Sequence, residues 1–165
     1  MLDLAFQNST ASEGYNSKFF EKTLLTSIRA LKISKRNIGI SVNVVGGAKI
    51  RELNRKYRHK NKVTDVLSFP MQENGYSETR DKKQVRSKEL VSGHLSSVAD
   101  LGDIFICLPF AKKEAKRENI GIERKLAQLT VHGFLHLMGY DHERSREDEE
   151  RMLSLEDKIS KELRY

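Results

Sequence analysis

The segment of residues 131–143, V-H-G-F-L-H-L-M-G-Y-D-H-E, places the strongest constraint on how this chain can fold. Its first two histidines, His132 and His136, are four residues apart, and residues at positions i and i+4 of an α-helix lie on one face. Gly139 comes three residues later, and glycine commonly closes a helix because it tolerates positive φ. The chain can then turn back and bring His142 to the two helical histidines. The spacing therefore predicts a helix, a sharp turn and three converging imidazoles.

Converging imidazoles are typical metal ligands. Three nitrogen ligands with a fourth position open to water are the pattern of a catalytic zinc site, whereas a structural zinc site has four protein ligands. The spacing H-x-x-x-H-x-x-G-x-x-H also matches the metzincin zinc-protease signature at every position but one. The exception is Gly133, which stands where those proteases have the glutamate that acts as general base. The sequence therefore predicts one zinc ion per chain, bound by His132, His136 and His142, without the protease's base.

Composition places this centre in a basic protein without an internal disulfide. The 165 residues suit one domain, and their net charge of +7 favours a polyanionic partner such as nucleic acid. The single cysteine, Cys107, lies in an apolar run, so we expect it in the core of a protein from a reducing compartment. We see no signal-peptide pattern at the N-terminus and no apolar run long enough to span a membrane. A cytoplasmic location is expected.

Hydrophobic patterning predicts an α+β fold. β-branched and alternating apolar residues predict strands over residues 2–7, 38–45, 64–71 and 101–108. Apolar residues at helical spacing predict helices over residues 16–31, 48–57, 110–118 and 123–138, and a last helix from Ser145. The expected architecture over residues 1–165 is a single α+β domain, with a small, mostly four-stranded sheet, about five packed helices and the zinc site on a central helix. Leu25, Tyr57 and Leu153 are among the residues expected on buried helix faces.

The sequence also predicts the position of the third strand and the nature of the segment after it. Pro70 removes a ladder hydrogen-bond donor, which places that end of the strand at a sheet edge. Residues 72–99 are rich in serine, lysine, glutamate and glycine and contain few large apolar residues. Because such a segment can bury little apolar surface, we expect an exposed flexible loop. His94 lies within it and is expected in solvent rather than at the metal.

The expected reaction is metal-assisted hydrolysis, because zinc lowers the pKa of bound water and polarises phosphoryl or carbonyl oxygens. Without a glutamate at position 133, another group must manage the proton or stabilise the transition state. Arg58 ends a short helix with a strongly basic outer face, and a guanidinium suits the charge of a phosphodiester transition state. A solvated surface is the alternative for most of these basic residues. Asp141 can orient a ligand or act as a base, or it can be a simple turn residue.

The order of these motifs resembles the YbeY-type endoribonucleases, the bacterial rRNA maturation factors. The signature H-G-x-L-H-L-x-G-Y-D-H matches residues 132–142. Residues 53–58 followed by residues 64–70 resemble a second family signature, and residues 101–104 resemble a third.

The resemblance implies a single-strand-specific, zinc-dependent endoribonuclease that acts in rRNA maturation, near the 3′ end of small-subunit rRNA, and in ribosome quality control. It also implies that the three histidines bind zinc and that Arg58 matches a functionally important arginine. The expected partners are single-stranded RNA, including rRNA, and the ribosome or its small subunit. Neither DNA nor a membrane is expected as a partner, and the sequence does not define the oligomeric state.

Two other functions are compatible with the same residues. One is a zinc peptidase or other amide hydrolase with a metzincin-like cage, which Gly133 and the lack of a recognisable Met-turn after His142 disfavour. The other is a non-catalytic RNA- or ribosome-binding factor with structural zinc, which the lack of a fourth protein ligand disfavours.

Overall fold

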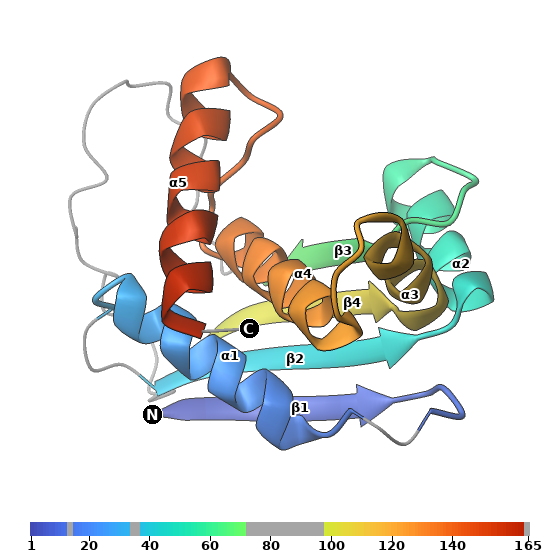
Figure 1. Ribbon diagram of the computed structural model, residues 1–165, viewed down its shortest axis with the longest axis horizontal. Helices are drawn as coiled ribbons and strands as arrows, with labels where there is room; N and C mark the ends of the chain where they lie inside the picture. Colours follow the sequence, from blue (N-terminus) through green and yellow to red (C-terminus); the bar gives the residue numbers. More distant parts are fainter. Residues whose placement is uncertain (13–14, 34–36, 72–97, 164–165) are drawn as a thin grey trace.

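The structure is a computed structural model that describes residues 1–12, 15–33, 37–71 and 98–163. Within these ranges the strands are β1 (Leu2–Asn8), β2 (Asn37–Val45), β3 (Val66–Pro70) and β4 (Val98–Cys107). The helices are α1 (Ser17–Ala30), α2 (Gly47–Arg58), α3 (Leu108–Arg117), α4 (Ile122–Leu137) and α5 (Arg146–Leu163). This arrangement, shown in Figure 1, confirms the predicted α+β fold class.

The four strands form one mixed sheet in the order β1-β2-β4-β3. β1, β2 and β4 are parallel, and β3 lies antiparallel to β4 at the edge of the sheet, as Pro70 predicts. Pro70 pairs with Gly102, whose φ is +116°. A Cβ atom at Gly102 would overlap the backbone carbonyl oxygen of Phe69. Only glycine therefore allows β3 and β4 to approach each other here.

The main core lies on one face of this sheet, between the strands and the helices α1, α3 and α4. Its fully buried members include Phe20 and Leu24 of α1, Val42 and Val44 of β2, Ile104 and Ile106 of β4, and Phe134 of α4. On the opposite side of α4, Val131 and Leu135 pack with Met152 and Ile159 of α5. Figure 1 shows α1 and α4 crossing one face of the sheet, with α5 against them. α4 is thus buried between the sheet and α5, which holds its side chains rigidly.

The opposite face of the sheet is covered by α2 at the β3–β4 edge. Ile50 and Leu53 of α2 pack there with Leu67 and with Cys107, which is buried as expected and whose burial raises the pKa of its thiol. Asn54, also buried in α2, donates its Nδ2 to the carbonyl oxygen of Lys62 at 2.8 Å. This bond fixes the basic loop that comes after the helix.

The buried helix faces are narrower than the sequence pattern predicts. Leu25, Tyr57 and Leu153 are 39 %, 54 % and 55 % exposed, so their expected burial is wrong. Leu25 and Leu153 each come directly after a fully buried residue, Leu24 and Met152. Because neighbouring helical residues point about 100° apart, the residue beside a buried one is turned toward solvent.

The loop predicted at about residues 72–99 overlaps at its end with β4, which begins at Val98. Its other residues, with His94 among them, lie outside the described ranges. In the part of the chain that is described, no helix has the length and apolar character needed to cross a membrane.

Candidate metal centre

The three predicted histidines meet at the C-terminal end of α4. One ligand atom from each of His132, His136 and His142 lies within 4.8 Å of the others. The Nε2 atoms of His132 and His136 are 3.1 Å apart, and the His142 ring centroid is 5.2 Å from each of the other two. Two nitrogens bound to one tetrahedral zinc, at about 2.0–2.1 Å each, lie about 3.3 Å apart. The residues present therefore fit a single metal ion.

The turn after α4 brings His142 back to the helix. Gly139 has φ +87°, and its N–H donates to the carbonyl oxygen of His136 at 3.0 Å. The N–H of Tyr140 donates to the carbonyl oxygen of Leu135, also at 3.0 Å. This pair of bonds is the Schellman arrangement that ends helices at a glycine. Gly139 therefore ends the helix, as its position predicts. The turn that begins there brings His142 close to His132 and His136.

A carboxylate from α5 contacts the first histidine. Oε1 of Glu156 lies 2.8 Å from Nδ1 of His132. When Nδ1 carries the proton and donates it to Glu156, Nε2 is left as an acceptor that faces the other histidines. Sequence reasoning missed Glu156. A usable signal was present, since this charged residue stands between Met152 and Ile159 on the apolar face of the last helix.

The electrostatics of the centre favour the neutral imidazole of His136. Burial lowers the pKa of His136, and the neighbouring His132 and His142 lower it further. A metal ion binds the neutral form of histidine, so no proton has to be displaced from His136 near neutral pH.

Asp141 lies in the turn between Gly139 and His142. Its Oδ1 accepts the backbone N–H of Glu143 at 3.0 Å, and its Oδ2 accepts Nε–H of Arg144 at 3.0 Å. The bond from Glu143 is the main cause that lowers the pKa of the Asp141 carboxyl, and Arg144 contributes as well. Asp141 is therefore an ionised residue with local donors on both oxygens.

Arg58 reaches the same turn from α2. Its Nη2 lies 3.4 Å from Oε1 of Glu143, the residue after His142. The Arg58 side chain is 43 % exposed. The structure thus places this predicted residue beside the histidine turn, although Arg58 and Glu143 are 85 positions apart in the sequence.

Gly133 faces the sheet. A Cβ atom at this position would lie 2.8 Å from Cγ2 of Ile104 and 3.0 Å from Oγ of Ser68. The position that holds the general base in the metzincin signature is therefore packed against β3 and β4, with no room for a glutamate side chain.

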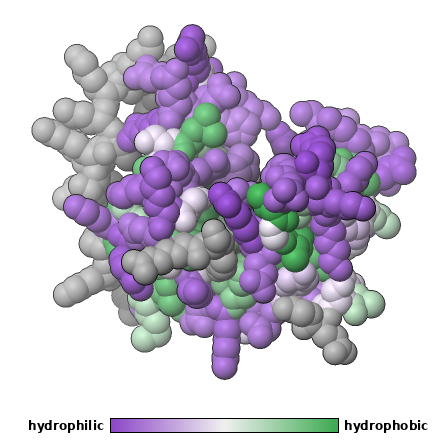
Figure 2. Space-filling view, viewed as in Figure 1, coloured by the Kyte–Doolittle hydropathy of each residue, from purple (hydrophilic) through white to green (hydrophobic). Residues whose placement is uncertain are grey.

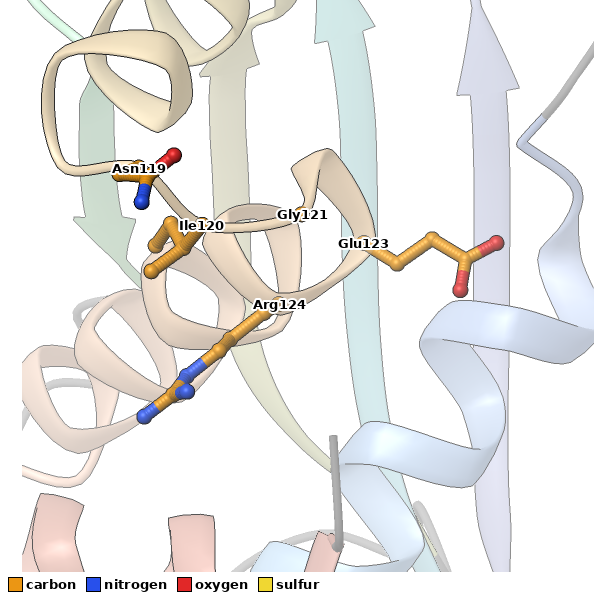
Figure 3. A pocket seen from close by; sticks show the side chains of 5 residues that line it. All are labelled: Asn119, Ile120, Gly121, Glu123 and Arg124. Carbon is orange, nitrogen blue, oxygen red and sulfur yellow. The ribbon is translucent and has the colours of Figure 1, made fainter.

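A pocket of about 390 Å³ lies elsewhere, at the turn between α3 and α4. Figure 3 shows its lining residues, which are Asn119, Ile120, Gly121, Glu123 and Arg124. It adjoins the N-terminal end of α4, whereas the histidines lie toward the C-terminal end. Glu123 and Arg124 point to different sides of the helix (Figure 3), so these charged groups do not converge, and we assign the pocket no role.

The fold and this centre together define a candidate metal-dependent hydrolase: an α+β domain with three histidines on and after one buried helix. The family model described as Endoribonuclease YbeY matches residues 4–164. The chain is 36 % identical over 162 residues to Endoribonuclease YbeY of Oenococcus oeni, which covers 96 % of this chain and 95 % of that protein. It is 35 % identical over 147 residues to Endoribonuclease YbeY of Persephonella marina, with 89 % and 83 % covered.

A solved structure has the same fold. The solution structure of a Thermotoga maritima protein superposes with a TM-score of 0.56 and 25 % sequence identity, covering 98 % of this chain and 92 % of the other. With the family match over nearly its whole length, this chain belongs to the YbeY family of endoribonucleases. The resemblance found in its sequence motifs is thereby confirmed.

Proposed function

We propose that this protein is a zinc-dependent endoribonuclease that cleaves single-stranded RNA during rRNA maturation, near the 3′ end of small-subunit rRNA, and takes part in ribosome quality control. The family supports an RNA substrate. The observation that carries the proposal is the convergence of three histidine ligand atoms within 4.8 Å. Three nitrogen ligands suit zinc and leave a position for a reacting group. The ribosome or its small subunit is the proposed partner, and the cytoplasm is the proposed location.

Each residue of the centre has a distinct role in this proposal. His132, His136 and His142 hold the zinc, which supplies a water of lowered pKa and polarises a phosphoryl oxygen when it is bound. Glu156 holds the proton of His132 on Nδ1 and so directs Nε2 to the ion. Asp141, with both oxygens bound to local donors, shapes the turn that presents His142.

Arg58 is proposed to stabilise the negative charge that develops on the phosphoryl oxygens. Its partner in the structure, Glu143, forms an exposed ion pair at 3.4 Å. Exposed pairs of this kind contribute only about 0–1 kcal/mol. The guanidinium can therefore leave Glu143 for an RNA phosphate, which it can bind through two parallel hydrogen bonds.

The substitution Arg58→Ala tests this role. We expect the variant to keep its melting temperature and its zinc content while its rate of RNA cleavage falls about 100-fold, because a preorganised charge is lost from the transition state. Arg55→Ala, which removes an exposed charge one turn earlier on the same helix, is the matched control and should retain most of the cleavage. Full cleavage by Arg58→Ala would remove Arg58 from the mechanism.

Two experiments distinguish the rival functions from the proposed one. The first compares substrates, and the second measures whether loss of a histidine unfolds the protein. A peptidase needs a base near its metal, and position 133 is packed against Ile104. We therefore expect the purified protein to cut unstructured RNA and to leave casein intact. If the zinc is structural instead, His136→Ala should unfold the protein together with its loss of RNA binding.

A further inference from the structure

The last turn of α2 carries an exposed aromatic ring on a packed aromatic base. The Tyr57 ring centroid is 5.0 Å from that of Phe69 on β3, and Phe69 is 5.7 Å from Phe105 on β4. Both contacts are edge-to-face, which is a favoured geometry for aromatic pairs. Phe69 and Phe105 are partly buried in the sheet, whereas Tyr57 is 54 % exposed. The tyrosine ring is therefore held by Phe69 on one side, and about half of the residue remains open to solvent.

The surface around this ring is strongly basic. Residues 47–62 contain one acidic residue, Glu52, and seven lysines and arginines: Lys49, Arg51, Arg55, Lys56, Arg58, Lys60 and Lys62. Nζ of Lys56 lies 5.0 Å from the centroid of the Tyr57 ring. Figure 2 shows hydrophilic side chains over the part of the surface where α2 lies. An aromatic ring among cations suits a ligand that carries both planar rings and negative charges.

The end of α2 that carries this ring also reaches the candidate centre through Arg58. Arg58, the residue after Tyr57, contacts Glu143 beside His142. The loop after α2 is fixed by the bond from Asn54 to Lys62 and by the N–H of Lys60, which donates to the Asn54 carbonyl oxygen at 3.2 Å. Because consecutive Cα atoms are only about 3.8 Å apart, a strand with a phosphate at Arg58 has a neighbouring base within reach of Tyr57.

We propose that Tyr57 is a base-stacking subsite for the RNA strand, with Lys56 as a neighbouring contact to its phosphates. This inference rests on the proposed function, since it concerns the same substrate. Stacking on an aromatic side chain accepts every base, so the subsite does not read sequence. It does require an unpaired base, because a paired base has both of its faces covered by its neighbours. Tyr57 thus selects single strands over duplexes.

The direct test uses fluorescence. The chain contains no tryptophan, so Tyr57→Trp introduces a single reporter at the subsite. We expect its emission to be quenched on addition of a 2′-O-methyl oligoadenylate and to be unchanged by an abasic strand of equal length. The matched control is Leu153→Trp on α5, where the native side chain is 55 % exposed. That tryptophan should not be quenched.

A second comparison measures affinity and cleavage together. Tyr57→Ala should bind the oligoadenylate about tenfold more weakly than wild type, while Tyr57→Phe retains the affinity and both variants keep the wild-type melting temperature. Equal quenching by the abasic strand, or equal affinity of Tyr57→Ala and wild type, would overturn the stacking subsite even if wild type cuts RNA. If wild type cuts no RNA but the base-dependent quenching occurs, the proposed function fails and the subsite stands.

Discussion

At the residue scale, metal binding by His132 depends on which of its two ring nitrogens carries the proton. Glu156 lies 2.8 Å from Nδ1 of His132, and the Nε2 atom of the same ring lies 3.1 Å from Nε2 of His136. One carboxylate on α5 thus determines the tautomer and the orientation of a ligand on α4. A carboxylate in this position also raises the basicity of the imidazole, which strengthens its bond to a metal.

We therefore expect Glu156→Ala to lower the zinc affinity about 10- to 100-fold, because His132 loses the partner that directs its Nε2. The measurement is a titration of metal-free protein with zinc in competition with a chelator. Glu156→Gln should restore part of the affinity, since its amide oxygen can still accept the Nδ1 proton. Asp157→Ala changes an exposed carboxylate that pairs with Lys161, and it is the control. An unaltered zinc affinity in Glu156→Ala would contradict the role given to Glu156.

At the element scale, α4 joins the site to the core. It is buried against the sheet on one side and against α5 on the other. The close contact with the sheet occurs at Gly133, one residue after the first histidine. Whatever moves α4 away from β3 and β4 also moves His132 and His136.

Gly133→Ala tests this packing. The added methyl group would lie 2.8 Å from Cγ2 of Ile104 and 3.0 Å from Oγ of Ser68. Overpacking of this kind costs about 1–3 kcal/mol, which exceeds the gain of about 1 kcal/mol from replacing a helical glycine by alanine. We expect a lower free energy of unfolding, measured by urea denaturation. Gly47→Ala in α2 meets Val63 at an ordinary 3.8 Å and should not destabilise. Equal stability of both variants would show that α4 can shift freely.

The helices and strands were predictable from sequence because their signals are local. A period of 3.6 residues identified α4, and Gly139 identified its end. Glu156 was missed because its contact with His132 depends on how α5 packs on α4. Its place on the apolar face of the last helix signals that it is partly buried, but not which residue it contacts. The predicted burial of Tyr57 was wrong because its ring meets the sheet only through Phe69 of the edge strand β3, which leaves the residue 54 % exposed. The sequence also revealed that a glutamate is absent at position 133 but not that Ile104 fills the space.

At the scale of the whole molecule, the fold assembles the candidate centre from three segments, of which α2 is distant from the other two in the sequence. α4 and its turn supply the histidines, α5 supplies Glu156, and α2 supplies Arg58. The antiparallel position of β3 at the sheet edge is what lets α2 lie beside the histidine turn, because β3 comes after α2 and pairs with β4 beneath α4. Their chemistry made the three histidines and Arg58 predictable from the sequence. The topology that brings them together was not predictable in this way.

The central claim is that one zinc ion on the three histidines makes this protein an endoribonuclease. Its most direct test is the metal content of wild type and His132→Ala, by elemental analysis, with RNA cleavage measured on the same preparations. We expect about one zinc per chain together with cleavage in wild type, and neither in a variant that remains folded. Wild-type protein that carries no transition metal, or that cuts RNA equally well after the metal is removed, would contradict the claim.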